Sequence, residues 1–306
     1  MDFMLDSQAR KVHIGGMNKL PAETRARILH LLCEGQSIRA TVRLTGVSKN
    51  TISKLLVTAG QACMAYQDRT LVNLTGTRWE VDELWSFVGA KERNVPAGKK
   101  HEMGDVWTWV ALDAKSKLVG AWYIGDRDVE AAMFFMDNLA KRLTNRIQLT
   151  SDGHAPYLQA VEGAFGADID FAMLVKIYGK ANEKPGRYSP PECIGAVKRV
   201  VEGKPDKSKV STSYVERNNG IIRQHCKRYA RLTQAFSKKV ENHVYAFALH
   251  TMYHNFVKIS GAHRTTPAQA AGVDSRCWEM SDMVAMIEEW EASLDGSARP
   301  MSDLQA

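Results

Sequence analysis

The sequence has 306 residues, 44% of them hydrophobic and 25% charged, a composition typical of a globular protein with one large core and small additional modules. No apolar run approaches the roughly 20 residues that a membrane-spanning helix needs, and the N-terminal residues lack the continuous apolar core of a signal peptide. The 5 cysteines include no C-x-x-C pair, which argues against a disulfide framework and a structural zinc site. We therefore expect a cytoplasmic protein with no membrane partner.

The distribution of charge is more informative than the net charge of +7. Residues 217–264 contain nine lysines and arginines against a single acid, Glu241, whereas residues 265–306 contain eight acids against two arginines. A basic segment of this kind indicates an anionic partner, and nucleic acid is the partner that it suits best. We interpret residues 265–306 as an acidic C-terminal tail.

Residues 20–70 have the pattern of three short helices, preceded by an N-terminal extension, residues 1–19. Ser37 and Ser48 are suitable N-caps for the second and third helices, and Gly46 lies at the turn between them. This pattern predicts an all-α helix-turn-helix domain whose third helix enters the major groove of DNA. The alternative is a three-helix bundle that does not contact DNA. The residues of the third helix expected to contact DNA are Lys49, Asn50, Thr51, Ser53 and Lys54.

Residues 71–264 predict a second domain, of the α/β class. Three strand-like runs with short polar connections predict an antiparallel meander, and helices then alternate with two further strands before a late helix. This order is that of a ribonuclease-H-like fold, a mixed sheet flanked by helices. Residues 179–213 are rich in proline, glycine and lysine, which predicts an inserted loop or lid, with one short hairpin as an alternative within it. The expected elements are strands at 78–88, 106–112 and 118–124, a helix at 129–142, a strand ending at residue 152, a helix at 155–165, a strand at 171–178 and a helix from about residue 214.

Three acids lie where the metal-binding carboxylates of such a fold would have to lie. Asp82 is inside the first strand, Asp152 ends a short strand before a glycine, and Glu216 is at the start of the last helix. Each has a structural alternative: Asp82 or its neighbour Glu80 is a solvated edge charge, Asp152 belongs to a turn, and Glu216 closes a capping box with Ser213. Together, in this strand order, the three acids indicate a metal site.

Carboxylates from two strands and a facing helix suit a pair of divalent cations. In-line cleavage of a phosphodiester requires stabilisation of the attacking and the leaving oxygen, and two ions about 4 Å apart achieve this by binding one phosphate between them. Mg²⁺ prefers hard oxygen ligands and keeps several waters, so two or three carboxylates are sufficient; Mn²⁺ is the alternative. Arg223 lies two helical turns after Glu216, so we expect it on the same face, holding the phosphate. The basic residues expected to contact DNA beyond it are Lys227, Arg228 and Arg231.

Three histidines need separate interpretation. His250 and His254 have i, i+4 spacing, but no acid or third ligand lies near them in the sequence, so we interpret them as residues of a helix packed on the core. His154 follows Asp152 closely and is a candidate for contact with the substrate.

Long stretches of the sequence, from about residue 20 to residue 273, resemble transposases of the IS1 insertion-sequence family. The resemblance is carried by extended motifs that include all three acids. These stretches are Val81–Gly89, Asp105–Asp113, Gly125–Asp128, Thr150–His154, Ser211–Asn219, Leu232–Lys239 and Thr266–Gly272.

The resemblance implies an Asp-Asp-Glu transposase, with a ribonuclease-H-like catalytic domain behind a helix-turn-helix. It places the catalytic acids at Asp82, Asp152 and Glu216 and a basic catalytic residue at Arg223. Such enzymes use Mg²⁺ to free the 3′ ends of the element and join the 3′-OH groups to target DNA. The resemblance also implies an oligomer, associated with the nucleoid, that bridges two terminal repeats of double-stranded DNA. Well-known members carry a cysteine zinc finger before the helix-turn-helix, and this sequence lacks its C-x-x-C pairs.

Two other functions fit parts of the same pattern. A DNA-binding regulator derived from a transposase would keep the helix-turn-helix and lose the chemistry, although all three acids and Arg223 are present here. A metal-dependent nuclease would cut without joining, and dependence on defined terminal repeats would distinguish it from a transposase.

Overall fold

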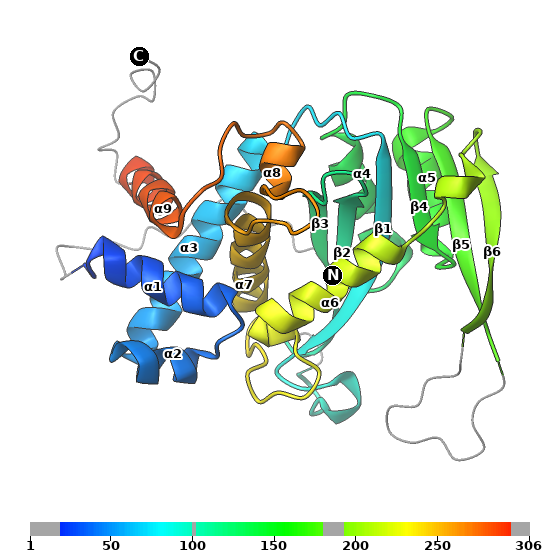
Figure 1. The fold of residues 1–306 in the computed structure, drawn as a ribbon. Helices are drawn as coiled ribbons and strands as arrows, with labels where there is room; N and C mark the ends of the chain where they lie inside the picture. The colour runs from blue at the N-terminus through cyan, green and yellow to red at the C-terminus, as the bar shows by residue number, and fades with distance from the viewer. Residues whose placement is uncertain (1–18, 100–101, 180–192, 295–306) are drawn as a thin grey trace.

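The computed structural model describes residues 19–99, 102–179 and 193–294 (Figure 1). Its centre is a mixed sheet with the strand order β3-β2-β1-β4-β5-β6. β4 pairs in parallel with β1 and with β5, and the remaining neighbours are antiparallel. The strands are β1 (Arg78–Val88), β2 (Gly104–Asp113), β3 (Val119–Gly125), β4 (Gln148–Asp152), β5 (Asp170–Tyr178) and β6 (Cys193–Glu202).

Helices flank this sheet, so the expected α/β class is confirmed. Figure 1 shows α6 crossing in front of β1, with α4 and α5 behind the sheet. Among the described helices, none is both long and apolar enough to cross a membrane. The helices are α1 (Ala22–Cys33), α2 (Ile38–Thr45), α3 (Lys49–Thr70), α4 (Val129–Ala140), α5 (Pro156–Phe165), α6 (Ser213–His225), α7 (Val240–Met252), α8 (Pro267–Ala270) and α9 (Met280–Leu294).

Local sequence signals account for the boundaries of the first helices. The Ser37 hydroxyl accepts a hydrogen bond from the Ala40 amide at 3.1 Å, and the Ser48 hydroxyl accepts one from the Thr51 amide at 3.2 Å. Gly46 ends α2 with a φ of 73°, a conformation that residues with a side chain rarely adopt. Both predicted N-caps and the predicted turn are therefore confirmed.

The first three helices are docked tightly on the rest of the molecule. α3 packs along α7, and a Cβ atom added to Gly60 would lie 2.2 Å from Cβ of Tyr245. A Cβ on Gly35 would lie 2.3 Å from the Gln224 carbonyl oxygen, at the end of α6. Both distances are too short for any larger residue, so these two glycines allow the helices to make direct contact.

Regular secondary structure is present in both of the segments that were predicted as a loop or lid and as a tail. Within residues 179–213, β6 pairs antiparallel with β5, whereas residues 180–192 lie outside the described residues. Within residues 265–306, α9 packs on α1, where the buried Arg25 guanidinium contacts Glu288 at 2.8 Å and Glu291 at 3.2 Å. The N-terminal extension up to residue 18 and residues 295–306 also lie outside the described residues.

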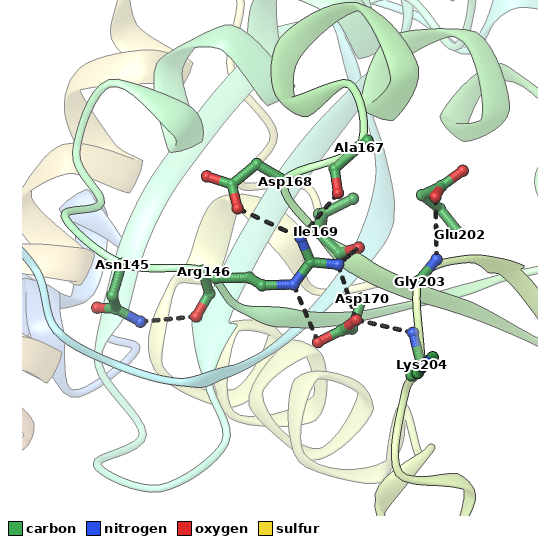
Figure 2. A network of polar contacts seen from close by, with 9 residues as sticks. All are labelled: Asn145, Arg146, Ala167, Asp168, Ile169, Asp170, Glu202, Gly203 and Lys204. Atoms are coloured by element: carbon green, nitrogen blue, oxygen red, sulfur yellow. Dashed lines mark hydrogen bonds and ion pairs between the residues drawn. The ribbon is translucent and has the colours of Figure 1, made fainter.

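An arginine network holds together the ends of three strands (Figure 2). Arg146, just before β4, donates to the carbonyl oxygens of Ala167 and Ile169 and to the Asp170 carboxylate at the start of β5. The same carboxylate accepts a hydrogen bond from the Lys204 amide, just after β6. A residue with a side chain at Gly203 would collide with Asp170, because its Cβ would lie 2.3 Å from the carboxylate. The network therefore fixes β4, β5 and β6 relative to one another.

Candidate metal centre

Asp82 lies in the middle of β1, the strand that pairs with both β2 and β4. Its side chain is half-buried and points toward α6, where its Oδ2 accepts a hydrogen bond from Nδ2 of Asn219 at 2.8 Å. That contact fixes one carboxylate oxygen of Asp82 between the sheet and the helix that carries Glu216.

Asp152 is brought next to Asp82 by the parallel pairing of β4 with β1. Glu80 is paired with Thr150, so the residues two positions further along both strands lie at the same level of the sheet. Oδ1 of Asp152 accepts a hydrogen bond of 2.9 Å from the main-chain amide of His154, which orients the carboxylate. The structure thus brings together two of the three predicted acids.

Glu83 joins this pair, and the sequence interpretation did not assign it a role. Oxygen atoms of Asp82, Glu83 and Asp152 all lie within 4.8 Å of one another. The Glu83 side chain is 1% exposed and forms an ion pair with Arg127 at 3.2 Å. The Tyr157 hydroxyl also interacts with this carboxylate and lowers its pKa. We therefore count Glu83 as a third carboxylate of the candidate metal centre.

The three carboxylates perturb one another electrostatically. Burial, followed by the charges of Asp152 and Glu216, raises the pKa of Asp82 to about 7. Burial and the charges of Asp152 and Asp82 raise the pKa of Glu83 to about 7, although Arg127 acts in the opposite direction. Such crowded, partly desolvated acids are costly to keep charged unless a cation is bound between them.

Glu216 lies beside this group but is directed partly toward other residues. Glu216 is not among the acids whose oxygens lie within 4.8 Å of one another, but Asn219, about one helical turn further along α6, donates to Asp82, and the charge of Glu216 contributes to the raised pKa of Asp82. At the same time Oε1 of Glu216 accepts hydrogen bonds from Nζ of Lys176, at 2.6 Å, and from the Thr212 hydroxyl. Glu216 is therefore next to the cluster of Asp82, Glu83 and Asp152, and a lysine of β5 balances its charge.

Glu80 has a structural role that connects the strand with the helix. Its side chain is 1% exposed, and its Oε2 accepts hydrogen bonds from the main-chain amides of Tyr214 and Val215 in the first turn of α6. Amides at a helix N-terminus otherwise have no partner within the helix. Glu80 is thus a buried cap for α6, and the alternative of a solvated edge charge is excluded for it.

Arg223 has hydrogen-bond partners of its own. Its guanidinium donates to the carbonyl oxygens of Tyr229 at 3.0 Å and Trp85 at 3.2 Å, which joins the end of α6 to β1. Burial lowers its pKa to about 10. The expected role in holding a phosphate stays a prediction, and the contacts give Arg223 a structural role.

The residues expected to contact DNA occupy two surfaces that face each other. Lys49 and Ser53, at the start of α3, line one cavity together with Lys227 and Arg228, which follow α6. Asn50, Lys54 and Arg231 are exposed, and Thr51 is half-buried.

The histidines differ in their surroundings. His250 and His254 are buried, their rings are 6.4 Å apart, and Nε2 of His254 lies 3.0 Å from the Lys117 carbonyl oxygen, as core residues would be placed. His154 packs against Trp109 beside the acid cluster.

The donor set fits a divalent cation that prefers oxygen. All three clustered ligands are carboxylates, the type that Mg²⁺ and Mn²⁺ bind. The crowding of these three carboxylates and the raised pKa values of two of them are the features that a bound cation would relieve. The described residues thus provide a metal-competent acid cluster on a mixed α/β sheet.

Comparison with known proteins adds one relative with sequence similarity. The chain is 29% identical over 164 residues to insertion element iso-IS1n protein InsB of Shigella dysenteriae, which covers 54% of this chain and 86% of the relative. No family model matches the sequence. Among solved structures, the piggyBac transposase synaptic complex with hairpin DNA aligns with 96% of this chain and 77% of its own, at a TM-score of 0.40 and 10% identity. The sequence similarity is therefore to a protein of an insertion element.

Proposed function

We propose that this protein is a DNA transposase of the Asp-Asp-Glu type, which cleaves the ends of an insertion element and joins their 3′-OH groups to target DNA. The observation that carries the proposal is the convergence of Asp82 and Asp152 from neighbouring strands, with Glu216 beside them on α6. The sequence similarity to an insertion-element protein supports the same conclusion.

The proposed metal ligands are Asp82, Asp152 and Glu216, with Glu83 as an additional carboxylate. When bound there, two Mg²⁺ ions, or Mn²⁺, would stabilise the attacking and leaving oxygens of the phosphodiester. Asn219 holds the Asp82 carboxylate in place, and the His154 amide does so for Asp152.

The proposed joining step exchanges one phosphodiester bond for another. The 3′ oxygen of the element forms a new P–O bond as the bond from phosphorus to the target's own 3′ oxygen breaks; the attacking hydroxyl gives its proton to solvent, and the departing 3′ oxygen takes one up and becomes a free 3′-OH. The role of the protein is to hold the element's 3′ end in line with the target phosphodiester, because the reaction needs little more than alignment and charge stabilisation.

The same proposal assigns the domains and partners. The sheet with its flanking helices is a ribonuclease-H-like catalytic domain, α1 to α3 form a helix-turn-helix, and double-stranded DNA is the substrate. The working form is a homo-oligomer that bridges two terminal repeats, in the cytoplasm and associated with the nucleoid.

A strand-transfer assay with Mg²⁺ and a labelled terminal repeat tests the proposal. Glu216→Gln keeps the size of the side chain and removes its charge, so joined products should fall by at least about a hundredfold while DNA binding persists. Glu162→Gln, on the exposed face of α5, is the matched control and should join normally. Titration of both variants with Mn²⁺ provides a readout that does not depend on activity.

The outcomes separate the proposal from its alternatives. Equal joining by the parent and Glu216→Gln would remove Glu216 from the site. DNA binding without cleavage or Mn²⁺ binding in the parent would favour the regulator. Cleavage without any joined product would favour the nuclease.

A further inference from the structure

A large basic cavity lies between the starts of α2 and α3 and the segment that follows α6. Its volume is about 640 Å³. In Figure 1 the end of α6 lies close to α7, and the contact of Gly35 with Gln224 places the turn before α2 against the same end. The cationic side chains that line the cavity are Arg39, Lys49, Lys227, Arg228 and Lys238.

The cavity has no negative charge of its own. No aspartate or glutamate of the described residues lines it. None of its five cations forms an ion pair with a carboxylate in the described part of the chain. The first turns of α2 and α3 also border the cavity, and helix N-termini carry partial positive charge. Cations held together without acids repel one another, and a bound polyanion relieves this repulsion.

The interior of the cavity offers a neutral polar group as well. His250 is 3% exposed and lines the cavity, and its Nδ1 has no hydrogen-bond partner among the described residues. Burial holds the pKa of His250 well below its usual value, so the imidazole is neutral. A buried polar atom without a partner is unusual in a folded protein, and this one belongs to a residue of the cavity wall.

We infer that this basic cavity binds the sugar-phosphate backbone of the DNA substrate, at a fixed distance from the acid cluster. The inference rests on the proposed function for the choice of DNA as the polyanion. A single inorganic anion would leave most of a cavity of this volume and most of its cations without a partner. A nucleic-acid strand engages several cations at once, and such contacts position the duplex without reading its sequence.

Helix α6 sets the distance between the two sites. Glu216 lies in its first turn, and Cys226, which lines the cavity, follows its last residue. These residues are ten positions apart, which corresponds to about 15 Å along a helix. Successive phosphates of one strand are about 3.4 Å apart along the DNA axis. For a duplex whose axis runs along α6, the backbone in the cavity is therefore roughly four to five base pairs from the phosphate at the acids.

The test is a salt titration of duplex binding, with the full chain in EDTA and a random-sequence duplex as the probe. The variant is Lys49→Gln with Lys227→Gln, one lysine from each side of the cavity. Its control is Lys115→Gln with Lys141→Gln, two exposed lysines elsewhere. The cavity variant should bind about tenfold more weakly, and the slope of log K against log salt should fall by about 2, since each lost phosphate contact removes about 0.9. The control should match the parent.

Further measurements keep this inference separate from the proposed function. Phosphate ethylation should interfere with binding roughly four to five base pairs from the cleaved end, in the parent and not in the cavity variant. Unchanged affinity and slope in a folded cavity variant that still binds Mn²⁺ would overturn the inference and leave the metal site intact. Stabilisation of the parent by pyrophosphate alone, without binding of the duplex, would identify a small-anion site and also overturn it.

Discussion

The Glu80 carboxylate accepts a hydrogen bond of 3.0 Å from the main-chain amide of Val215, and thereby joins the centre of β1 to the first turn of α6. Asp82 lies two residues beyond Glu80 on the same strand face, and Glu216 directly follows Val215. The position of one proposed metal ligand relative to another therefore depends on this buried cap, together with the contacts of Asn219 with Asp82 and of Arg223 with Trp85.

Glu80→Ala should uncouple α6 from β1. The substitution leaves the Tyr214 and Val215 amides without an acceptor in a buried environment, which costs about 1–3 kcal/mol. A urea denaturation curve should show a lower midpoint, and strand transfer should fall with it. Glu80→Gln is the matched control, because its amide oxygen still accepts from the helix. Equal stability of the alanine variant and the parent would contradict the role of Glu80 as a cap.

Lys176→Gln should strengthen metal binding. Lys176 and a metal ion compete for Glu216, and both partners of the ion pair are about a third exposed, at 32% and 39%. The pair is therefore worth about 0.2–1 kcal/mol, so Mn²⁺ affinity should rise by up to about fivefold in a titration followed by electron paramagnetic resonance. Lys198→Gln, on the adjacent strand, should leave the affinity unchanged. Weaker binding by Lys176→Gln would show that the lysine assists the metal site.

Asp82→Asn should gain stability relative to the parent as pH rises, when metal is removed with EDTA. The folded pKa of about 7 lies above the ordinary value near 3.9, so the folded parent retains a proton that the unfolded chain has lost. This proton stabilises the folded parent at low pH, and its contribution to stability is lost as pH rises towards 7. The asparagine variant has no such loss, and its melting temperature should exceed that of the parent by about 3–6 °C at pH 8.

Two further comparisons check that interpretation. The difference in melting temperature should be smaller at pH 5 than at pH 8 and should disappear below about pH 4, where Asp82 is neutral in both the folded and the unfolded state. Mg²⁺ at pH 8 should stabilise the parent more than Asp82→Asn, since only the parent has the full set of charged ligands. A difference in melting temperature that is constant between pH 5 and pH 8 would contradict the raised pKa.

Arg223→Ala should reduce the stability of the protein, in addition to any change in its affinity for DNA. The variant leaves the carbonyl oxygens of Trp85 and Tyr229 without their guanidinium donor, at an expected cost of about 1–3 kcal/mol. Urea denaturation measures this cost, and Arg223→Lys should recover part of it. An unchanged denaturation midpoint, with only DNA affinity reduced, would assign Arg223 to the substrate alone.

Local signals allowed much of the fold to be predicted from the sequence. Ser37, Gly46 and Ser48 act through hydrogen bonds and backbone conformation within a few residues, so their effects can be recognised without knowledge of the tertiary structure. The apolar runs of β1, β2, β3 and β5 were identified for the same reason. The length of the third helix was predicted less accurately, because a short helix was expected and α3 continues over 22 residues to Thr70.

Features that depend on distant contacts were missed or were predicted only in part, as with the short hairpin that was the alternative for residues 179–213. β6 follows a segment rich in proline and glycine, and its strand conformation depends on pairing with β5. Successive side chains of a strand point to opposite faces, so Glu83 was not assigned to the site of Asp82. Glu80 and Thr150 are the last residues that pair β1 with β4, and β1 continues beyond this point. The side chains of Asp82 and Glu83 therefore both reach Asp152. The cap that Glu80 provides joins residues 134 positions apart, and no local pattern indicates it.

The close contact of Gly60 with Tyr245 has a consequence for the geometry of the substrate. Because α3 lies directly on α7, the helices that would read DNA cannot turn independently of the sheet that bears the acids. Duplex DNA completes a turn in about ten base pairs, so a rigid protein of this kind accepts a recognition sequence in one rotational phase relative to the cleaved phosphate. Five base pairs inserted between them would place that phosphate on the far side of the duplex, whereas ten would restore its orientation and change only its distance.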